Sequence, residues 1–504
     1  MYSQPIYWQL AISTDRKYSS SSISLRAIKI ICVIRSQRII SRVIKKVKNA
    51  LTKNADEYHS DLLNPKVITR GEHGISRKGI SDNALKVLYR LNGAGFDAYL
   101  VGGCVRDLIM GLQPKDFDVV TNATPDEVKA LFRNCRLIGR RFRLAHVVFG
   151  REIIEVATFR GHHQNSDDEK GKKPTEVLGK QSQEGQILRD NVFGSIEEDA
   201  ERRDFTVNAM YYRVTDFTVT DFANGMQAIK DKRLELIGDP ETRYREDPVR
   251  MLRAVRFAAK LNMQISQESA AAIHQLGSLL NNIPPARLFE EVIKLFISGQ
   301  GLRTFELMQE YDLIQPLFPQ LAPLLKGSDS RENQFIRKML MNTDNRINTG
   351  QRVTPAFMYA AFLWYPIEEH CQKLMDEAGL NHFDAFNIAV NDVLHRQIQR
   401  IMIPKRFSSM MREIWLLQLR LPKRFGRRAY QMLEHARFRA AYDFLLIRGQ
   451  IEGGKLLELA DWWTEFQEVS PDKRKQMLVK LREAEGGPAR RTRRRPKSKK
   501  PSAS

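Results

Sequence analysis

The sequence predicts an α/β segment followed by an all-helical segment. From Ser81 on, short apolar strands alternate with capped helices and glycine turns. After about Asp239 strands largely disappear, and apolar residues recur at spacings of three and four, as in Met251, Leu252 and Val255. A chain of 504 residues is also too long for one ordinary hydrophobic core, so we expect several domains.

The α/β segment starts with an amphipathic helix expected over Asn83–Leu91, which ends at the Asn92-Gly93 turn. Thr124-Pro125-Asp126-Glu127 predicts another helix start, because it offers an N-cap hydroxyl, a proline at N1 and acids in the first turn. The polar, aperiodic stretch 161–188 is expected to be a flexible loop. Strands are expected over Ala98–Val101, Phe117–Val120, His146–Phe149 and Ile153–Phe159.

The charge is strongly basic and uneven. The chain has 81 Lys+Arg against 59 Asp+Glu, a net charge of +22, of which +10 lies in residues 1–54 and +8 in the last nineteen residues. Such an excess predicts a polyanionic partner, with nucleic acid ahead of an anionic membrane. The basic residues 1–54 are either a start assigned too far upstream or a real basic arm, and both interpretations stay open.

The cysteines and the hydropathy indicate the cellular compartment in which the protein works. The four cysteines have no paired spacing, which argues against a disulfide framework and a cysteine-based zinc site and fits a reducing cytosol. No apolar run reaches the roughly 18 residues that span a bilayer. We therefore expect a cytoplasmic protein without an integral membrane segment.

Two carboxylates are placed for cation binding. In a strand alternate side chains share a face, so Asp116 and Asp118 point the same way while Phe117 packs behind them. Oxygen ligands at this spacing suit Mg²⁺ held together with substrate phosphates, with Mn²⁺ as an alternative. Glu155, in an apolar strand, is either a third metal ligand or half of a buried salt bridge.

Glycines and arginines near these acids indicate a triphosphate site. Gly102-Gly103 follows a strand and precedes Arg106, so the backbone and a cation can approach phosphates there. Further along, Arg203 can neutralise a phosphate, and Asp204 can accept from a ribose hydroxyl or hold an arginine.

The segment Glu246–Phe257 carries the remaining candidates. On one helix, Asp247 and Arg250 would be neighbours, as would Arg250 with Arg253 and Arg253 with Arg256. This is either a solvated basic stripe or a base-reading surface. An acid beside an arginine would select adenine or cytosine without choosing between them.

Four segments, in this order, resemble the class II nucleotidyltransferases, the family of tRNA CCA-adding enzymes and bacterial poly(A) polymerases. The resemblance implies a polymerase-beta-like α/β head followed by an all-helical neck, body and tail, an α+β fold overall. It also implies that RNA 3′-hydroxyl attacks the α-phosphate of a nucleotide and that pyrophosphate leaves. The segments are Leu100–Asp107 (LVGGCVRD), Lys115–Asp118 (KDFD), Arg203–Ala209 (RDFTVNA) and Glu246–Arg253 (EDPVRMLR).

By this resemblance Asp116, Asp118 and Asp204 are the catalytic carboxylates, and the first two, with Glu155 as the candidate third, bind the metal. Asp247 and Arg250 read the base. The triphosphate and ribose are held by Gly102, Gly103, Arg106, Arg203, Arg253 and Arg256. The implied domains are a basic extension 1–54, a catalytic head 55–215, a base-reading neck 216–300, an RNA-binding helical body 301–484 and a disordered Arg/Lys/Pro-rich tail 485–504.

Within the family the sequence looks most like the poly(A) polymerase I group. This implies ATP as substrate, RNA 3′ ends of mRNA and other transcripts as partners, mRNA polyadenylation linked to turnover, and RNA-decay proteins as further partners. The alternatives are a CCA-adding enzyme and, from another class, a non-catalytic RNA-binding protein. The stretches that favour the poly(A) group are Phe132–Arg136 (FRNCR), Thr158–His163 (TFRGHH), Arg189–Ala200 (RDNVFGSIEEDA) and Tyr244–Asp247 (YRED).

Overall fold

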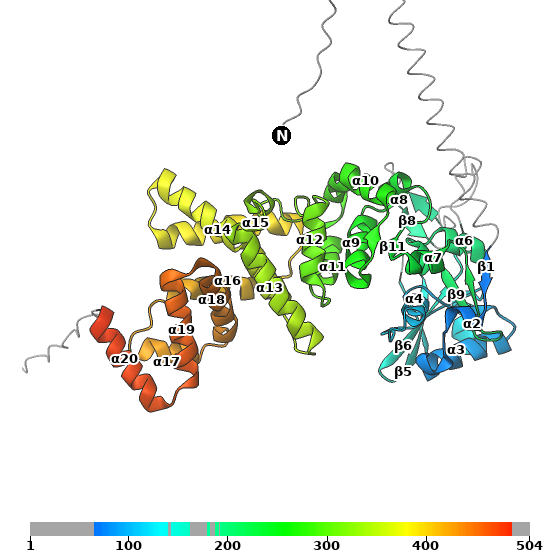
Figure 1. Cartoon of the computed structure of the whole chain (residues 1–504), viewed down its shortest axis with the longest axis horizontal. Coiled ribbons are helices and arrows are strands. Elements are labelled where there is room, and N and C mark those ends of the chain that lie inside the picture. The colour runs from blue at the N-terminus through cyan, green and yellow to red at the C-terminus, as the bar shows by residue number, and fades with distance from the viewer. Residues whose placement is uncertain (1–64, 140–142, 162–178, 182–186, 191, 486–504) are drawn as a thin grey trace, which may run out of the picture. The chain divides into compact units, whose positions relative to one another are not determined.

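A computed structural model of the chain describes residues 65–139, 143–161, 179–181, 187–190 and 192–485 (Figure 1). The predicted basic extension 1–54 and all but the first residue of the predicted tail 485–504 lie outside the described residues. So does most of the predicted loop 161–188. Two pieces of it are strands, β7 (Gly179–Gln181) and β8 (Ile187–Asp190), which pair antiparallel, so the expectation of a structureless loop was wrong there.

The head is built on a mixed sheet. In the described part of the chain, eight strands form one sheet in the order β1-β10-β9-β2-β3-β6-β5-β4, with β3 and β6 parallel. The four predicted strands are confirmed within two residues of their ends, whereas the strands at both sheet edges were not predicted. The bounds are β1 Lys66–Ile68, β2 Ala98–Val101, β3 Asp118–Thr121, β4 Cys135–Ile138, β5 Leu144–Phe149, β6 Glu152–Thr158, β9 Met210–Arg213 and β10 Thr218–Asp221.

Helices cover one face of this sheet and close the first hydrophobic core. Leu88 of α3 (Asp82–Gly93) and Val128 of α5 (Pro125–Leu131) pack there with Leu100 and Val119 of the central strands. The predicted start of α5 is confirmed, since Thr124 and Glu127 form a reciprocal capping box. Shorter elements join the strands: α2 Arg70–His73, η1 Arg77–Gly79, α4 Gly103–Ile109, α6 Ile196–Glu201, η2 Thr206–Asn208 and α7 Gly225–Lys230.

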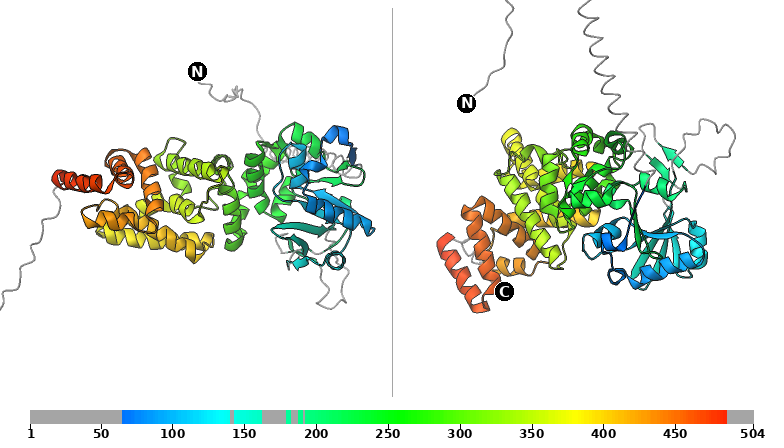
Figure 2. Two further views of the ribbon diagram at one scale, coloured as in Figure 1. Left: turned by 90° about the horizontal axis from the view of Figure 1, so that it is seen from below. Right: turned by 45° about the vertical axis from the view of Figure 1, so that its right-hand side comes forward.

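The segment after the sheet is helical, as predicted, except for the two-residue strands β11 (Arg233–Leu234) and β12 (Gln264–Ile265). Figure 2 shows these helices, coloured from green to red along the chain, in two further views. The bounds are α8 Pro240–Glu246, α9 Val249–Leu261, α10 Gln267–Leu276, η3 Gly277–Asn282, α11 Pro285–Phe296, α12 Gly301–Glu310, η4 Ala322–Leu324, α13 Arg331–Asn348, α14 Pro355–Ala378, α15 His382–Arg400, α16 Lys405–Arg420, α17 Arg427–Leu433, α18 Phe438–Glu452, α19 Gly454–Glu468 and α20 Pro471–Glu485.

Two further cores stabilise the helical segment. The larger one is continuous from Phe205, at the edge of the head, through α9 and α11 to Ile447 of α18. The smaller one gathers around Trp463 of α19 and includes Leu421 and Phe438. Since one core spans the end of the head and the start of the neck, the loop that carries Arg203 is held by packing against α9. None of the helices that the structure describes is both long and apolar enough to cross a membrane.

Candidate active site

The predicted metal carboxylates lie at the start of a central strand. Asp118 is the first residue of β3, and Asp116 precedes it by two residues, with Phe117 buried between them. In the sheet, Asp118 stands opposite Val101 of β2 on one side and opposite Glu155 of β6 on the other. The fold therefore places Asp118 and Glu155 side by side in the sheet, with Asp116 just before the strand and close enough for its charge to act on Asp118.

The negative charges in this region disfavour one another. The protein packed around Asp118 desolvates its carboxylate, and together with the charges of Glu155 and Asp116 this raises the pKa of Asp118 to about 6, although Arg203 opposes the rise. Crowded carboxylates of this kind suit a cation. Among the described residues no three His, Cys, Asp or Glu side chains form a ready metal cluster, so a bound Mg²⁺ would need further oxygen ligands from water and substrate phosphates, which is its usual preference.

Glu155 has a second neighbour. Its carboxylate lies 3.5 Å from Nε2 of His146 on β5, and 49% of its side chain is exposed. A buried salt bridge, one of the two expectations for Glu155, is therefore not what the structure shows, because the Glu155 side chain beside His146 is half exposed to solvent. Its role as third metal ligand stays a prediction.

The Gly102-Gly103 turn connects β2 to α4 and faces an arginine. Gly102 has φ of +75° and ψ of −131°, a conformation that side-chain-bearing residues rarely adopt. A Cβ atom at this position would lie 3.6 Å from Nη1 of Arg203. The turn therefore brings its backbone close to a guanidinium group with no side chain between them, as a phosphate-binding turn requires.

Arg203 is held in place by an acid and a phenol. Its Nε and Nη2 donate to Oδ2 of Asp199 at 3.2 and 2.9 Å, and Nε also donates to the Tyr211 hydroxyl at 2.8 Å. Because these bonds use Nε and Nη2, Nη1 stays available on the side of the Gly102 turn. Asp199 is thus a positioning residue that the sequence analysis missed, although its i,i+4 spacing from Arg203 was a visible signal.

Arg106, predicted to hold the triphosphate, lies in the interior. Its side chain is buried, it donates to Oδ1 of Asp107 from Nε at 2.9 Å, and its Nη1 donates to Oδ1 of Asn208 at 2.7 Å. The guanidinium also lies 5.4 Å from the centre of the Phe257 ring on α9. These contacts tie the helix after the glycine turn to the neck, and direct phosphate contact by Arg106 stays a prediction.

Asp204 connects the head to α9. Its Oδ2 accepts from Nε of Arg253 at 2.9 Å and from Nη2 of the same group, while Oδ1 accepts from the Phe205 N–H at 2.9 Å and from Nδ2 of Asn208 at 3.1 Å. Burial alone would raise the pKa of Asp204, but the charge and hydrogen bonds of Arg253 outweigh it and lower the pKa to about 2. With both oxygens occupied, Asp204 is placed to orient Arg253.

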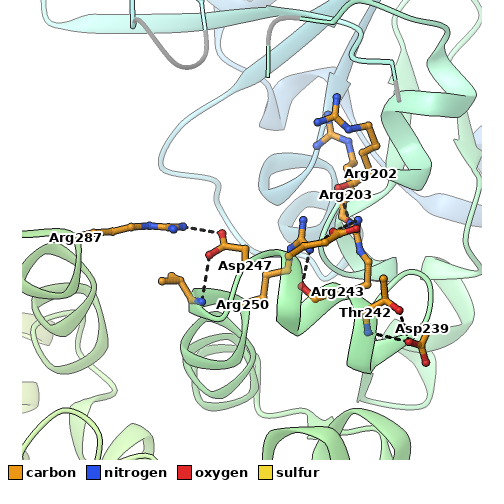
Figure 3. Close-up of polar contacts among 10 residues, drawn as sticks. Arg202, Arg203, Asp239, Thr242, Arg243, Asp247, Arg250 and Arg287 are labelled. Atoms are coloured by element: carbon orange, nitrogen blue, oxygen red, sulfur yellow. Dashed lines mark hydrogen bonds and ion pairs between the residues drawn. The ribbon is translucent and has the colours of Figure 1, made fainter. Parts of the chain in front are cut away.

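The base-reading pair is arranged differently from a single helical stripe. Asp247 is the last residue before Pro248 and has φ of −148°, so it lies outside α9, and the expectation that it shares a helix with Arg250 was wrong. The proline explains this, because it disfavours helical conformation in the residue before it. Oδ2 of Asp247 accepts from Nη2 of Arg287 on α11 at 2.6 Å (Figure 3). Arg250 instead pairs with Glu246 at 2.7 Å.

A second missed residue, Arg243 of α8, joins these parts. Its Nη2 donates to the main-chain carbonyls of Arg202 and Arg203, both at 2.7 Å, and its own carbonyl accepts from Arg250 at 2.8 Å (Figure 3). Burial and the nearby charge of Arg250 lower the pKa of Arg243 to about 10. Arg243 therefore links the arginine that faces the glycine turn to the arginine predicted to read the base.

Arg256 is a predicted nucleotide ligand with an unpaired N–H group. Its guanidinium lies 4.8 Å from the centre of the Phe257 ring, and its buried Nε has no hydrogen-bond partner among the described residues. Burial and the charge of Arg253 lower the pKa of Arg256. A buried, unpaired guanidinium N–H favours an anionic ligand.

The fold and this site define a class II nucleotidyltransferase. Three family models match, described as "Poly A polymerase head domain" over residues 98–235, "Probable RNA and SrmB- binding site of polymerase A" over 262–325 and "Polymerase A arginine-rich C-terminus" over 378–499. A solved structure titled "tRNA-processing enzyme (apo form I)" is similar in fold, with a TM-score of 0.53 and 20% identity over 80% of this chain and 98% of that one.

Related proteins show which group of the nucleotidyltransferase family the chain belongs to. The "Poly(A) polymerase I" of Salmonella typhimurium is 54% identical over 468 residues, which is 92% of this chain and 99% of the relative. A "CCA-adding enzyme" of Lactobacillus helveticus is 34% identical over only 46% of this chain and 53% of the relative. The chain belongs to the bacterial poly(A) polymerase I family, and it is a polynucleotide adenylyltransferase.

Proposed function

We propose that this protein is a template-independent poly(A) polymerase that transfers AMP from ATP to RNA 3′ ends with the residues assembled around Asp118. The observation that carries the site assignment is that Asp118 stands in register with Glu155 in the same head that turns Nη1 of Arg203 towards the Gly102 turn. Carboxylates for a cation and a guanidinium for phosphates are thus fixed by one sheet and its following loops. We further propose that the protein acts on RNA in the cytoplasm, alongside RNA-decay proteins.

Each group of site residues would have a separate role in the reaction. Asp116 and Asp118 would hold Mg²⁺ or Mn²⁺, which when bound lowers the pKa of the RNA 3′-hydroxyl and neutralises charge on the reacting oxygens. The Gly102 turn and Arg203 would bind the departing pyrophosphate, with Arg203 kept in position by Asp199 and Arg243. Arg253, oriented by Asp204, and the unpaired Arg256 would bind the remaining phosphate and ribose oxygens.

Base selection would rest on Asp247 and Arg250. A carboxylate accepts from the 6-amino group of adenine, and a guanidinium donates to a ring nitrogen. In this structure Arg287 occupies Oδ2 of Asp247, and Glu246 and the Arg243 carbonyl occupy Nη1 of Arg250. These contacts hold both base-reading groups in one orientation. A fixed orientation favours recognition of one kind of base, rather than of adenine and cytosine alternately.

The test is extension of a generic RNA in Mg²⁺ with each nucleoside triphosphate separately. We expect long tails with ATP alone and a loss on the order of a hundredfold or more in the Asp116→Ala/Asp118→Ala variant. Asp126→Ala is the matched control, since Asp126 is an exposed acid of the same head whose ion pair with Arg143 lies away from the site. Tailing that persists unchanged in the double variant would refute the metal-site assignment.

The same assay separates the rival functions. A CCA-adding enzyme would require CTP and would stop after a short defined addition on tRNA. A non-catalytic RNA-binding protein would bind the RNA without extending it in any nucleotide. Neither outcome is compatible with the proposal.

A further inference from the structure

A second cavity lies in the helical body, away from the carboxylates and arginines described above. It has a volume of about 600 Å³, a size typical of small-molecule sites, and is lined by α13, α14, α16 and α18 together with the α13–α14 loop. Three family models match the chain, but none of them covers residues 326–377, which form one side of this cavity.

The rim of the cavity is positively charged. Five cations line it against one acid, Asp443 of α18, a balance of +4. Burial raises the pKa of Asp443, and the charges of Arg439 and Arg346 oppose that rise without cancelling it. The lining cations are Lys338, Arg346, Arg352, Arg437 and Arg439.

Two of these cations form ion pairs with acids, and the other three form none in the described part of the chain. Arg439 pairs with Asp443 at 3.0 Å and Arg437 pairs with Glu413 at 3.1 Å. Lys338, Arg346 and Arg352 form no ion pair with any acid in the described part of the chain, and Arg346 and Arg352 are exposed. An uncompensated positive rim attracts an anionic ligand.

The floor of the cavity is apolar. Half-buried Phe357 of α14, Met410 of α16 and Leu446 of α18 line it, and the Phe357 ring is braced edge-on by Phe444, with ring centres 5.9 Å apart. Asn342 and Gln450, which carry side-chain amides, also line the cavity. An aromatic and apolar floor, side-chain amides and a basic rim are the combination that holds an unpaired nucleobase and its flanking phosphates.

The spacing of the cations favours a polyanion over one small anion. Lys338 and Arg346 lie on one face of α13 two turns apart, about 12 Å along the helix axis. A single phosphate cannot contact both side chains when they are extended, whereas a strand that carries a phosphate at every nucleotide can. A purely acidic peptide would match the rim but has no planar ring to stack on the aromatic and apolar floor.

We propose that this cavity binds an unpaired nucleotide of the substrate RNA upstream of its 3′ end, with the base on the Phe357 floor and the backbone phosphates on Lys338, Arg346 and Arg352. The proposal rests on the proposed function for the identity of the RNA. It adds a distal contact that would hold the growing tail while its 3′ end is extended.

The test compares the full-length wild type with the Arg346→Ala/Arg352→Ala variant in two measurements. The first is binding of oligoadenylate across a salt series. Loss of two phosphate contacts should weaken binding about tenfold at fixed salt and reduce the slope of log K against log salt by about 1.4, at about 0.7 per contact for single strands. The second is the KM for primer in ATP incorporation over a series of primer lengths.

In the second measurement we expect the KM of the wild type to fall once the primer is long enough to reach the cavity. The variant should lose that fall, while its kcat and its KM for ATP on the shortest primer stay unchanged. The Lys373→Ala/Lys475→Ala variant is the matched control, since it removes two exposed, ion-paired cations that do not line the cavity. It should behave like the wild type.

The outcomes distinguish the cavity proposal from the proposed function. The cavity proposal would be overturned if the variant kept the salt slope and the primer-length dependence of the wild type. It would also be overturned if the protein bound an acidic peptide through Arg346 and Arg352 but did not bind oligoadenylate through them. Failure of the wild type to incorporate ATP on any primer would instead refute the proposed function. The salt series would still decide whether the cavity binds RNA.

Discussion

Replacement of Asp204 by asparagine tests the link between the head and the neck most directly. Asparagine keeps the shape of the side chain but removes the charge that binds Arg253. The side chain of Asp204 is only 13% exposed, so solvent screens this ion pair weakly. The contact lies between a loop of the head and helix α9, so its loss should affect both stability and nucleotide binding.

The magnitude follows from the pKa. The charge of Arg253 and the hydrogen bonds lower the pKa of Asp204 from the ordinary 3.8 to about 2. At about 1.4 kcal/mol per pKa unit, the charged form contributes about 2 kcal/mol to the free energy of unfolding at pH 7. Because the pKa is lower in the folded state, the contribution is complete above about pH 4 and is lost as the pH falls towards 2. At pH 3 it should be about 1 kcal/mol.

Urea unfolding followed by circular dichroism at pH 7 and pH 3 would measure this difference. We expect Asp204→Asn to lose about 2 kcal/mol at pH 7 and about half of that at pH 3. The control is Asp126→Asn, whose ion pair with Arg143 has both side chains about half exposed or more and should contribute within about 0.5 kcal/mol. A loss at pH 7 no larger than that of the control, or a loss of the same size at both pH values, would refute the reasoning.

Three other substitutions test the nucleotide site. Gly102→Ala should strain a backbone with φ of +75° and lower kcat/KM by about tenfold or more in a steady-state assay; wild-type activity would contradict a role for the turn. Arg243→Met should raise the KM for ATP without changing the KM for primer, because the loop that carries Arg203 loses two hydrogen bonds; equal changes in both constants would argue against it. Arg287→Ala should free Asp247 and raise CTP incorporation relative to ATP severalfold, and an unchanged ratio would show that Arg287 has no part in base selection.

Local patterns predicted local structure well. The strand at Ala98–Val101 is found with the predicted bounds, and the capping box at Thr124 starts a helix where its residue types require one. These elements depend on neighbours within a few residues, and such neighbours are visible in any sequence. The edge strand β1 was missed because it has only three residues and owes its conformation to pairing with β10, far along the chain.

The candidate site was predicted as a set of residues but not as a set of contacts. Asp118 and Glu155 stand opposite each other, since β3 and β6 pair in register, whereas Asp116 precedes the strand and the metal role of all three stays a prediction. Asp247 was placed on a helix from its spacing alone, although the Pro248 that follows it already argued for a helix boundary.

The sequence by itself determined the fold class, the order of the motifs and the family, because each depends on residue types at fixed short spacings. Only the tertiary structure decided which charged groups are partners. Arg106 bonds to Asn208 across 102 positions, Arg253 to Asp204 across 49 and Arg287 to Asp247 across 40. Such partners lie on different elements, and the packing of those elements around shared cores, rather than any spacing along the chain, brings the charges together and fixes their pKa values.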